Sequence, residues 1–390
     1  MSEGQTTVTP ADALNKAEAP IEPRRAFVSP GMPALDIGGE KALSFYEFWP
    51  TWAMYLPVVV QWLVLAAWHR SLTLPLIANP RLPISGMVGV PKSQLLAQAE
   101  GECQRAILPW FLHTATEQPV AEQARVIQAE MASRQFQFPI VCKPDIGCRG
   151  SGVKLVHGEQ QLRDCLNSYA VGSDMMVQRL ASWEPEAGIF YVREPQQTEG
   201  RIISLALKYT PYIVGDGRST LQELIAADPR ANQLQHLYHG RHREQLHEVI
   251  PYGKPYRLVF SASHCRGAIF KDGSHLITSA LSERVNRIMA DLPEFYYGRL
   301  DIKFSHIDNL MRGDDIEIVE INSASSESLH IWDKDTPFKE AIAALLRQYR
   351  LLFTFGAQNR RRGHRTPGIS ELIKRWRHER KLTQYHPETD

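Results

Sequence analysis

A lysine followed by a glycine-rich loop is the first feature of this sequence that could do chemistry. The apolar run 140–142 predicts a buried strand that delivers Lys143, and the run 153–156 predicts a returning strand. Between them lie Gly147, Gly150, Ser151 and Gly152. Glycines let backbone N–H groups approach an anion closely, and a lysine at a strand end adds a point charge. The stretch therefore suits a polyphosphate, with an ordinary glycine-rich hairpin as the alternative. The Walker pattern is absent, because no Gly-Lys-Ser/Thr closes the loop.

Two predicted strands nearer the C-terminus place oxygen-bearing side chains where they could meet. Residues 297–304 and 316–322 alternate between apolar and polar types, and the polar stretch 305–315 predicts a connecting turn. If the strands are antiparallel neighbours, three hard oxygen ligands converge: Asp301, Glu320 and Asn322. Such a set suits Mg²⁺, which takes one or two carboxylates together with substrate phosphates. An exposed hairpin with solvated charges is the alternative.

The same alternation predicts which neighbours share this face. A period of two places Arg299 and Lys303 beside Asp301. On the second strand, the same period directs Val319 and Ile321 into the core. The predicted face therefore carries cations as well as carboxylates.

The elements that would position these groups alternate between helix and strand. Apolar residues at helical spacing predict a helix over 120–135, ahead of the glycine loop. Thr220 and Glu223 form a capping-box pattern at the start of a later helix. Between these two helices we expect a helix and three strands, at 159–169, 175–180, 188–193 and 202–208.

Length and composition describe an ordinary globular chain. Its 390 residues are enough for about two or three domains with a large core, and 43% of them are hydrophobic. The formal net charge of +1 gives no general reason to expect a nucleic-acid partner. The five cysteines contain no C-x-x-C pair, which fits reduced thiols in a cytosol. Residues 1–35 show no signal-peptide pattern and are rich in Ala, Pro, Thr and Glu, so we expect them to be disordered.

Two segments leave peripheral membrane contact open. The apolar stretch 53–68 is shorter than the about 20 residues that a span needs, and Pro57 and Gln61 interrupt it, so we expect a buried or interfacial helix. The segment 49–68 also holds four tryptophans, which favours surface association. Residues 360–381 carry nine Lys or Arg around an amphipathic stretch. That pattern is typical of a solvated tail or a packing helix, with an anionic membrane or RNA surface as the alternative.

Histidines gather in a predicted insertion. Residues 229–265 contain five of them, and His236 and His239 could share a helix face. No third ligand stands at a convincing spacing, so we expect a polar surface insertion rather than a metal site. Contacts between this insertion and a substrate are left open.

Five segments, taken in order, resemble the ATP-grasp superfamily, and within it the carboxylate–amine ligases related to D-alanine–D-alanine ligase and cyanophycin synthetase. They fall within about residues 86–350, at 138–144 with the following glycine loop, 177–180, 215–220, 298–301 and 319–322. The resemblance implies an α+β ATP-grasp fold, in which two α+β subdomains clasp ATP behind a short atypical N-terminal domain. The expected parts are a tail at 1–35, a helical pre-grasp region at 36–118, a small lid subdomain at 119–182, a metal and substrate subdomain at 183–355 that contains the 229–265 insertion, and a basic tail or helix at 356–390.

The resemblance also implies how ATP would be held. The phosphates would be contacted by two lysines, Lys92 and Lys143. The lid that closes over the γ-phosphate would consist of Gly150, Ser151 and Gly152. The adenine hinge would be lined by Gln178, Arg179 and Leu180. The ribose hydroxyls would be held by Glu186, with Glu184 as the weaker choice.

Further roles follow from the same resemblance. Two Mg²⁺ ions, for which Mn²⁺ could substitute, would be bound by Asp301, Glu320 and Asn322. Arg299 would stabilise the charge that develops on the acyl centre, and Lys143 would share that catalytic role at the phosphate. Arg193 is a weaker candidate for contact with a substrate carboxylate or phosphate.

The implied reaction is a two-step ligation by a cytoplasmic enzyme, with membrane association left open. A small-molecule carboxylate would take the γ-phosphoryl group of ATP to give an acylphosphate and ADP, and an amine substrate, or another nucleophile, would then displace phosphate. The family often continues after the metal asparagine with a Pro-Gly loop, whereas this chain has the serine-rich loop 323–328. A kinase and a nucleotide-binding scaffold without turnover therefore remain alternatives, and a homo-oligomer is left open.

Overall fold

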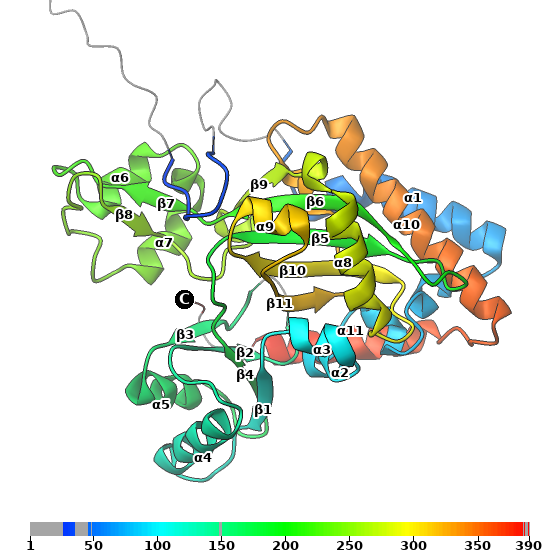
Figure 1. Cartoon of the computed structure of the whole chain (residues 1–390), viewed down its shortest axis with the longest axis horizontal. Helices are drawn as coiled ribbons and strands as arrows, with labels where there is room; N and C mark the ends of the chain where they lie inside the picture. Colours follow the sequence, from blue (N-terminus) through cyan, green and yellow to red (C-terminus); the bar gives the residue numbers. More distant parts are fainter. Residues whose placement is uncertain are drawn as a thin grey trace, which may run out of the picture.

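The structure is a computed structural model that describes residues 26–35, 46, 47, 49–147, 150–384, 386 and 389. The described chain contains a four-stranded and a five-stranded antiparallel sheet, together with a small pair of strands (Figure 1). Helices pack on both larger sheets. The α+β class predicted from the sequence is therefore confirmed.

The four-stranded sheet has the order β1-β4-β2-β3. Its strands are β1 (Trp110–Thr114), β2 (Ile140–Pro144), β3 (Lys154–Val156) and β4 (Asp174–Arg179). Two helices pack on it, α4 (Val120–Ser133) and α5 (Glu159–Asn167). In α4, Ala124, Ile127 and Met131 are buried because their spacing places them on one side of the helix. The predicted helix and the strand pair around the glycine loop are thus confirmed.

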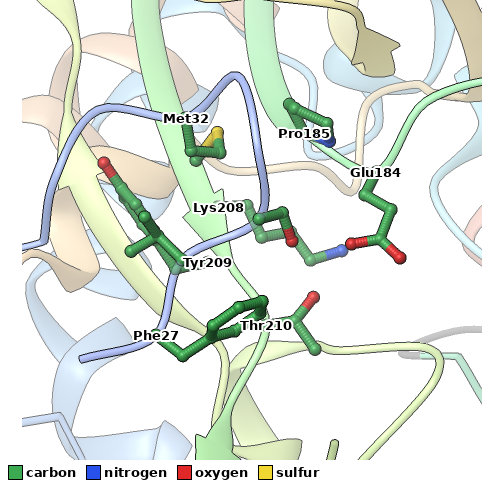
Figure 2. A pocket seen from close by; sticks show the side chains of 9 residues that line it. Phe27, Met32, Glu184, Pro185, Lys208, Tyr209 and Thr210 are labelled. Atoms are coloured by element: carbon green, nitrogen blue, oxygen red, sulfur yellow. The ribbon is translucent and has the colours of Figure 1, made fainter. Parts of the chain in front are cut away.

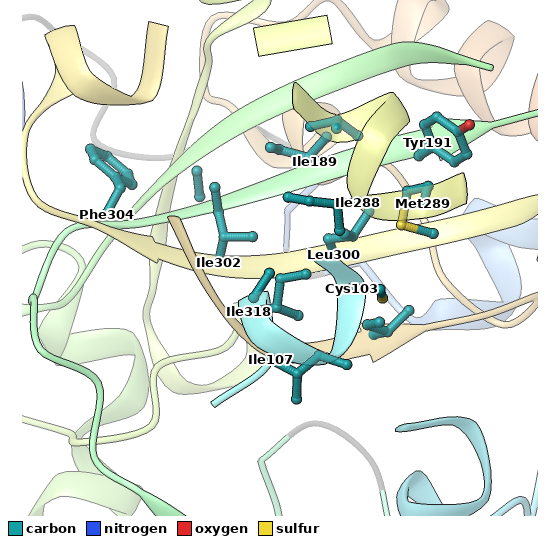
Figure 3. Packing of buried hydrophobic residues seen from close by; sticks show 14 of the residues in the cluster. Cys103, Ile107, Ile189, Tyr191, Ile288, Met289, Leu300, Ile302, Phe304 and Ile318 are labelled. Carbon is teal, nitrogen blue, oxygen red and sulfur yellow. The ribbon is translucent and has the colours of Figure 1, made fainter. Parts of the chain in front are cut away.

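The five-stranded sheet has the order β11-β10-β5-β6-β9. Its strands are β5 (Glu186–Val192), β6 (Arg201–Tyr209), β9 (Ile269–Asp272), β10 (Tyr297–Phe304) and β11 (Ile316–Asn322). On one face it is covered by α3 (Gly101–Ala106) and α8 (Ser279–Ala290), and Figure 3 shows Ile288 and Met289 of α8 above Leu300 of β10. The predicted antiparallel pairing of residues 297–304 with residues 316–322 is confirmed by β10 and β11.

The opposite face of this sheet packs against α10 (Phe338–Arg361), with Phe190 and Tyr297 against Leu352 and Phe355. The helix α1 (Thr51–His69) lies on the outer side of α10 (Figure 1). Only 17% of its apolar stretch is buried, so it is not a buried core helix. Within the described chain, it is the one helix whose length and composition would allow it to cross a membrane.

The remaining helices and turns complete the fold. The strands β7 (Tyr212–Val214) and β8 (Pro255–Arg257) pair next to α6 (Leu221–Ala227) and α7 (Gln235–Arg241). The predicted capping box of Thr220 and Glu223 starts α6 and is confirmed. Near the C-terminus lies α11 (Ile369–Thr383). Short 3-10 turns occur at Leu74–Ile77, Pro83–Gly86, Ala231–Leu234, His264–Arg266, Ser274–Leu276 and Leu329–Trp332.

The segment 26–35 is ordered, so the prediction of disorder over the whole of 1–35 is wrong for this part. The hydroxyl of Tyr209 donates to the carbonyl of Pro33 at 3.2 Å, and the N–H of Ile307 donates to the carbonyl of Gly31 at 3.0 Å. The segment packs along the five-stranded sheet because these tertiary contacts satisfy its backbone. The rest of that prediction lies outside the described residues.

The connection between β10 and β11 is a short helix rather than the predicted plain turn. This helix, α9 (Ile307–Arg312), ends at Gly313, whose positive φ of 77° suits a glycine. Leu310 is fully buried against the sheet core. Burial of Leu310 thus fixes the position of this otherwise polar connection.

Candidate active site

A backbone carbonyl on β11 is one of the points at which the two larger sheets contact each other. Lys143, at the end of β2, donates from Nζ to the Val319 carbonyl of β11 at 3.3 Å. The amide nitrogen of Gln178, on β4, donates to the same oxygen at 3.3 Å. The predicted phosphate lysine and the predicted metal strand are therefore adjacent in space.

A β-bulge makes this carbonyl available. Asp301 pairs with Glu320, whereas the next residue, Ile302, pairs with Ile318, so that Val319 is an extra residue on β11. The prediction that Val319 points into the core is therefore wrong. A bulge leaves its extra residue out of the ladder, and the fully buried Ile318 fills the core instead.

Lys143 is an almost completely buried cation. Its Nζ donates to Oε1 of Gln178 at 2.8 Å, which fixes the direction of the side chain. Burial lowers the pKa of Lys143 to about 8, because desolvation disfavours the ammonium form. Glu320 acts in the opposite direction on this pKa, and Lys92 lowers it further. The site thus holds a lysine whose charge changes close to neutral pH.

Lys92 is the second predicted phosphate lysine, and it reaches the same place from the first turn of α2 (Lys92–Leu96). Its Nζ donates to the carbonyl of Gly147 at 2.7 Å and lies 3.9 Å from Oε1 of Glu320. The carboxylate of Asp145 accepts from the backbone N–H of Ser93 at 2.8 Å. These contacts attach α2 to the strand that carries Lys143, so that both lysines border the glycine loop.

The predicted metal residues lie together on β10 and β11. Asp301 and Glu320 are direct partners across the two strands. The amide nitrogen of Asn322 donates to Oδ2 of Asp301 at 2.9 Å. Gly188 of β5 is the partner of Asp301 on the other side, and a side chain there would collide with Leu329. The sequence-predicted trio is thus brought together by strand pairing.

Arg299 holds Asp301 with two hydrogen bonds, from Nε at 2.7 Å and from Nη2 at 3.0 Å. Burial alone would lower the pKa of Arg299, but the facing Asp301 carboxylate more than offsets this and raises it. Nη1 of the same guanidinium donates to the carbonyl of Glu327 at 3.0 Å. Arg299 therefore connects the carboxylate pair to the loop after β11.

The donor set fits a magnesium site that is completed by substrate. Among the described residues, no group of three or more His, Cys, Asp and Glu side chains is arranged to hold a metal by itself. Two facing carboxylates and one amide oxygen are nevertheless what Mg²⁺ uses when phosphates supply the other ligands. The histidines of the 229–265 insertion do not form such a group in the described chain.

Glu186, predicted to hold the ribose, is engaged by two lysines. It forms a close ion pair with Lys208, and its Oε2 lies 3.1 Å from Nζ of Lys303. Burial would raise the pKa of Glu186, but the two lysines outweigh burial and lower it to about 2. Glu184 is exposed and lines a small neighbouring pocket with Lys208 and Phe27 (Figure 2). The ribose role of either carboxylate stays a prediction.

The predicted adenine-hinge residues have three different environments. Gln178 is buried beneath Lys143, as described above. Arg179 pairs with Glu317 at 2.5 Å, and Leu180 follows the end of β4 and is half-buried. In this structure Gln178 orients Lys143, and the adenine-hinge role of the three residues stays a prediction.

Residues near the C-terminus lie against the glycine loop. The N–H of Gly152 donates to Oγ1 of Thr389 at 2.8 Å, and Oγ1 in turn donates to the carbonyl of Gly150 at 3.1 Å. Arg266 donates to the same two oxygens, each at 2.9 Å. Sequence reasoning missed these contacts, because 239 positions separate Thr389 from Gly150.

Arg193 and Tyr55 lie away from this cluster. Arg193, the weaker substrate candidate, follows β5 and packs over the ring of Tyr296 at 5.6 Å. Tyr55 of α1 donates its hydroxyl to the Glu327 carboxylate, in the loop after β11. Burial and the nearby Glu327 charge raise the pKa of Tyr55, so the phenol is neutral and acts as a donor. Nothing in the local sequence signals this long-range contact.

Comparison with known proteins gives matches among solved structures alone, since no protein-family model and no curated protein matches the chain. Similar structures include a bifunctional glutathione synthetase from Pasteurella multocida, D-alanine–D-alanine ligase from Bacillus anthracis and VanG D-Ala:D-Ser ligase from Enterococcus faecalis. Their identities to this chain are 12%, 13% and 11%, with TM-scores of 0.33, 0.38 and 0.36. In the same order, the matched regions cover 64%, 72% and 66% of this chain. They cover 34%, 72% and 63% of the three solved chains. Similarity at this level does not establish a family for the chain, and the function therefore rests on the geometry of the site.

Proposed function

We propose that this chain is an ATP-dependent carboxylate–amine ligase that forms an amide bond through an acylphosphate. One observation carries the proposal. Two lysines, Lys143 and Lys92, border a glycine loop directly beside the facing carboxylates Asp301 and Glu320. Cations that meet phosphate oxygens, next to carboxylates that suit Mg²⁺, are what a site for phosphoryl transfer from ATP needs.

The lysines would bind and orient the triphosphate. The buried ammonium of Lys143 is held by Gln178, so little reorganisation is needed when a phosphate oxygen arrives. Lys92 is bonded to the loop carbonyl of Gly147, and a phosphate would offer it a stronger, charged acceptor. Both lysines would neutralise charge on the transferring oxygens.

The carboxylate pair would hold Mg²⁺ together with Asn322. When bound, Mg²⁺ supplies charge neutralisation at the phosphate oxygens. Arg299 holds Asp301 in place and lies beside the loop after β11. From there its guanidinium could also stabilise negative charge on the acyl group during the second step.

The proposed chemistry balances as two displacements. An oxygen of the substrate carboxylate attacks the γ-phosphorus, the bond to the β-phosphate oxygen breaks, and ADP leaves. The amine nitrogen then attacks the acyl carbon and loses a proton, and the carbon–oxygen bond to phosphate breaks. The glycine loop would exclude water that could otherwise hydrolyse the acylphosphate.

The test is ADP release from Mg-ATP by the purified full chain, with pools of amino acids, dipeptides and polyamines and with hydroxylamine as a trap. Substrate-dependent ADP together with a hydroxamate is the expected result, and the mass of the hydroxamate would name the acid. ADP with a phosphorylated product and without hydroxamate would replace the ligase by a kinase. Measurable ATP binding without any ADP over broad pools would favour a scaffold.

A further inference from the structure

One side of α1 exposes a continuous row of large apolar side chains. Each member is at least 52% exposed, and the two end members, Trp52 and Trp68, reach 72% and 83%. The row, called here the α1 apolar face, consists of Trp52, Leu56, Val59, Val60, Leu63, Val64 and Trp68. Steps of three and four residues keep these side chains on one side of the helix. A contiguous exposed patch of this kind marks an interaction surface.

The inner side of α1 is apolar as well. Met54, Val58 and Ala66 are buried, and the ring of Trp62 lies 5.2 Å from that of Phe353 on α10. The helix contains no Asp, Glu, Lys or Arg along its 19 residues. A helix between protein and water normally has a polar outer side. Its inner side is occupied by α10, so α1 fits a position parallel to an apolar surface rather than across a membrane.

Positive charge borders one end of the α1 apolar face. Arg70 follows the helix directly, and Arg360 of α10 donates to the carbonyl of His69 at 3.1 Å. Arg361 is close as well, since burial and both α10 arginines lower the pKa of His69. Within the described chain, none of these three arginines forms an ion pair with a carboxylate. Anionic lipid headgroups would supply the missing counter-charge.

A shallow groove joins the apolar face to this charge. Its volume is about 450 Å³, and it is lined by Leu63, Ala66, Ala67, Arg70, Ser71 and Leu72. Apolar walls next to a guanidinium match a lipid, in which an acyl chain adjoins a charged headgroup. Tryptophans at both ends of the row suit the interface between headgroups and acyl chains.

We propose that α1 attaches this protein to the surface of a bilayer that contains anionic lipids. The helix lies in the plane of the interface, with the α1 apolar face among the acyl chains and Arg70, Arg360 and Arg361 at the headgroups. The helix α11, which carries the C-terminal part of the basic segment 360–381, is placed differently, because Glu379 accepts from the backbone N–H of Gly89, beside α2, at 2.6 Å. The lipid contact is therefore assigned to α1.

This attachment is independent of the proposed ligase reaction, but the structure connects the two places. Tyr55 lies on α1 and donates to the Glu327 carboxylate, while the Glu327 carbonyl accepts from Arg299. An acceptor substrate would bind at the loop after β11. When α1 is docked on a membrane, only this helix would separate that loop from the lipid surface.

The experiment is flotation of the full chain with vesicles of phosphatidylcholine containing about one-third phosphatidylglycerol. The test variant is Val60→Glu combined with Val64→Glu, which places two charges on the α1 apolar face. The matched control is Val126→Glu on α4, because Val126 is 53% exposed and Val60 is 56% exposed. Circular dichroism and thermal melting of all three proteins establish that each is folded.

The wild-type chain and the α4 control should float with these vesicles, and the double variant should bind about tenfold more weakly or worse. Vesicles of phosphatidylcholine alone should capture less wild-type protein, because the arginines lose their counter-charge. Equal flotation of wild type and double variant would overturn the proposal. So would a wild-type chain that stays unbound but forms a dimer that the double variant loses, because the face would then contact a second copy.

Discussion

Asp301 and Glu320 occupy directly opposed positions on β10 and β11, at the last regular pair before the bulge at Val319. Their carboxylates therefore face the same space, and the amide of Asn322 borders it. The Asp301–Glu320 pair is therefore the part of the candidate site that mutations should test first.

Glu320→Gln is expected to reduce ADP formation by about a hundredfold or more, because one carboxylate of the proposed Mg²⁺ site is lost. Asp301→Asn should have the same effect on ADP formation, but it should also lower stability, since it leaves the buried Arg299 without its charged partner. The measurement is the steady-state rate of ADP release. The matched control is Asp314→Asn, which changes an exposed carboxylate that pairs with Arg312. Full activity in both site variants would remove the metal assignment.

Lys143 gives the site a predicted pH dependence. Its pKa of about 8 means that the ammonium form dominates below that pH and is lost above it. ATP affinity should therefore fall as the pH rises through about 8, because the neutral amine no longer attracts phosphate. Titration of the dissociation constant for ATP between neutral and alkaline pH measures this effect.

Two variants move this midpoint in opposite directions. Lys92→Met should raise it, because Lys92 lowers the pKa of Lys143. Glu320→Gln should lower it, because the Glu320 carboxylate raises that pKa. An unchanged midpoint in both variants would mean that another group controls ATP binding.

Glu186 is expected to contribute to stability at neutral pH through Lys208 and Lys303. Its folded pKa of about 2 lies below the ordinary value of 4.5, so this stability is present above about pH 4.5 and is lost as the pH falls towards 2. Glu186→Gln should lower the free energy of unfolding at pH 7 by about 3 kcal/mol, and the difference from wild type should shrink in acid. Urea unfolding at both pH values tests this.

The same variant separates two roles for Glu186. Loss of stability with nearly unchanged ATP affinity would make it a structural residue. Unchanged stability with much weaker ATP binding would contradict the structural prediction and favour the predicted ribose contact.

Oγ1 of Thr389 accepts a hydrogen bond from the N–H of Gly152, which lies in the loop that is predicted to close over the γ-phosphate. A chain shortened by residues 385–390 should therefore bind ATP about three- to tenfold more tightly, because a competing hydrogen-bond partner has been removed. A synthetic peptide of residues 381–390 added to the shortened chain should weaken ATP binding again. Equal or weaker binding by the shortened chain would show that these contacts do not compete with nucleotide.

Local sequence determined the faces and boundaries of most elements around the site. Strict alternation over 297–304 predicted that Arg299, Asp301 and Lys303 share one face, and the buried positions between them confirm it. The capping box at Thr220 and Glu223 predicted the start of α6 in the same way. Such signals are readable because side-chain period and capping act over two to four residues.

The tertiary structure alone decided which distant residues meet. The bulge at Val319 depends on how β10 and β11 register, and it exposes the carbonyl that Lys143 contacts. Tyr55 reaches Glu327 across 272 positions, and Thr389 reaches Gly150 across 239. These contacts follow from the packing of whole elements, so no pattern of a few residues can encode them, and they determine what surrounds Lys143 and the glycine loop.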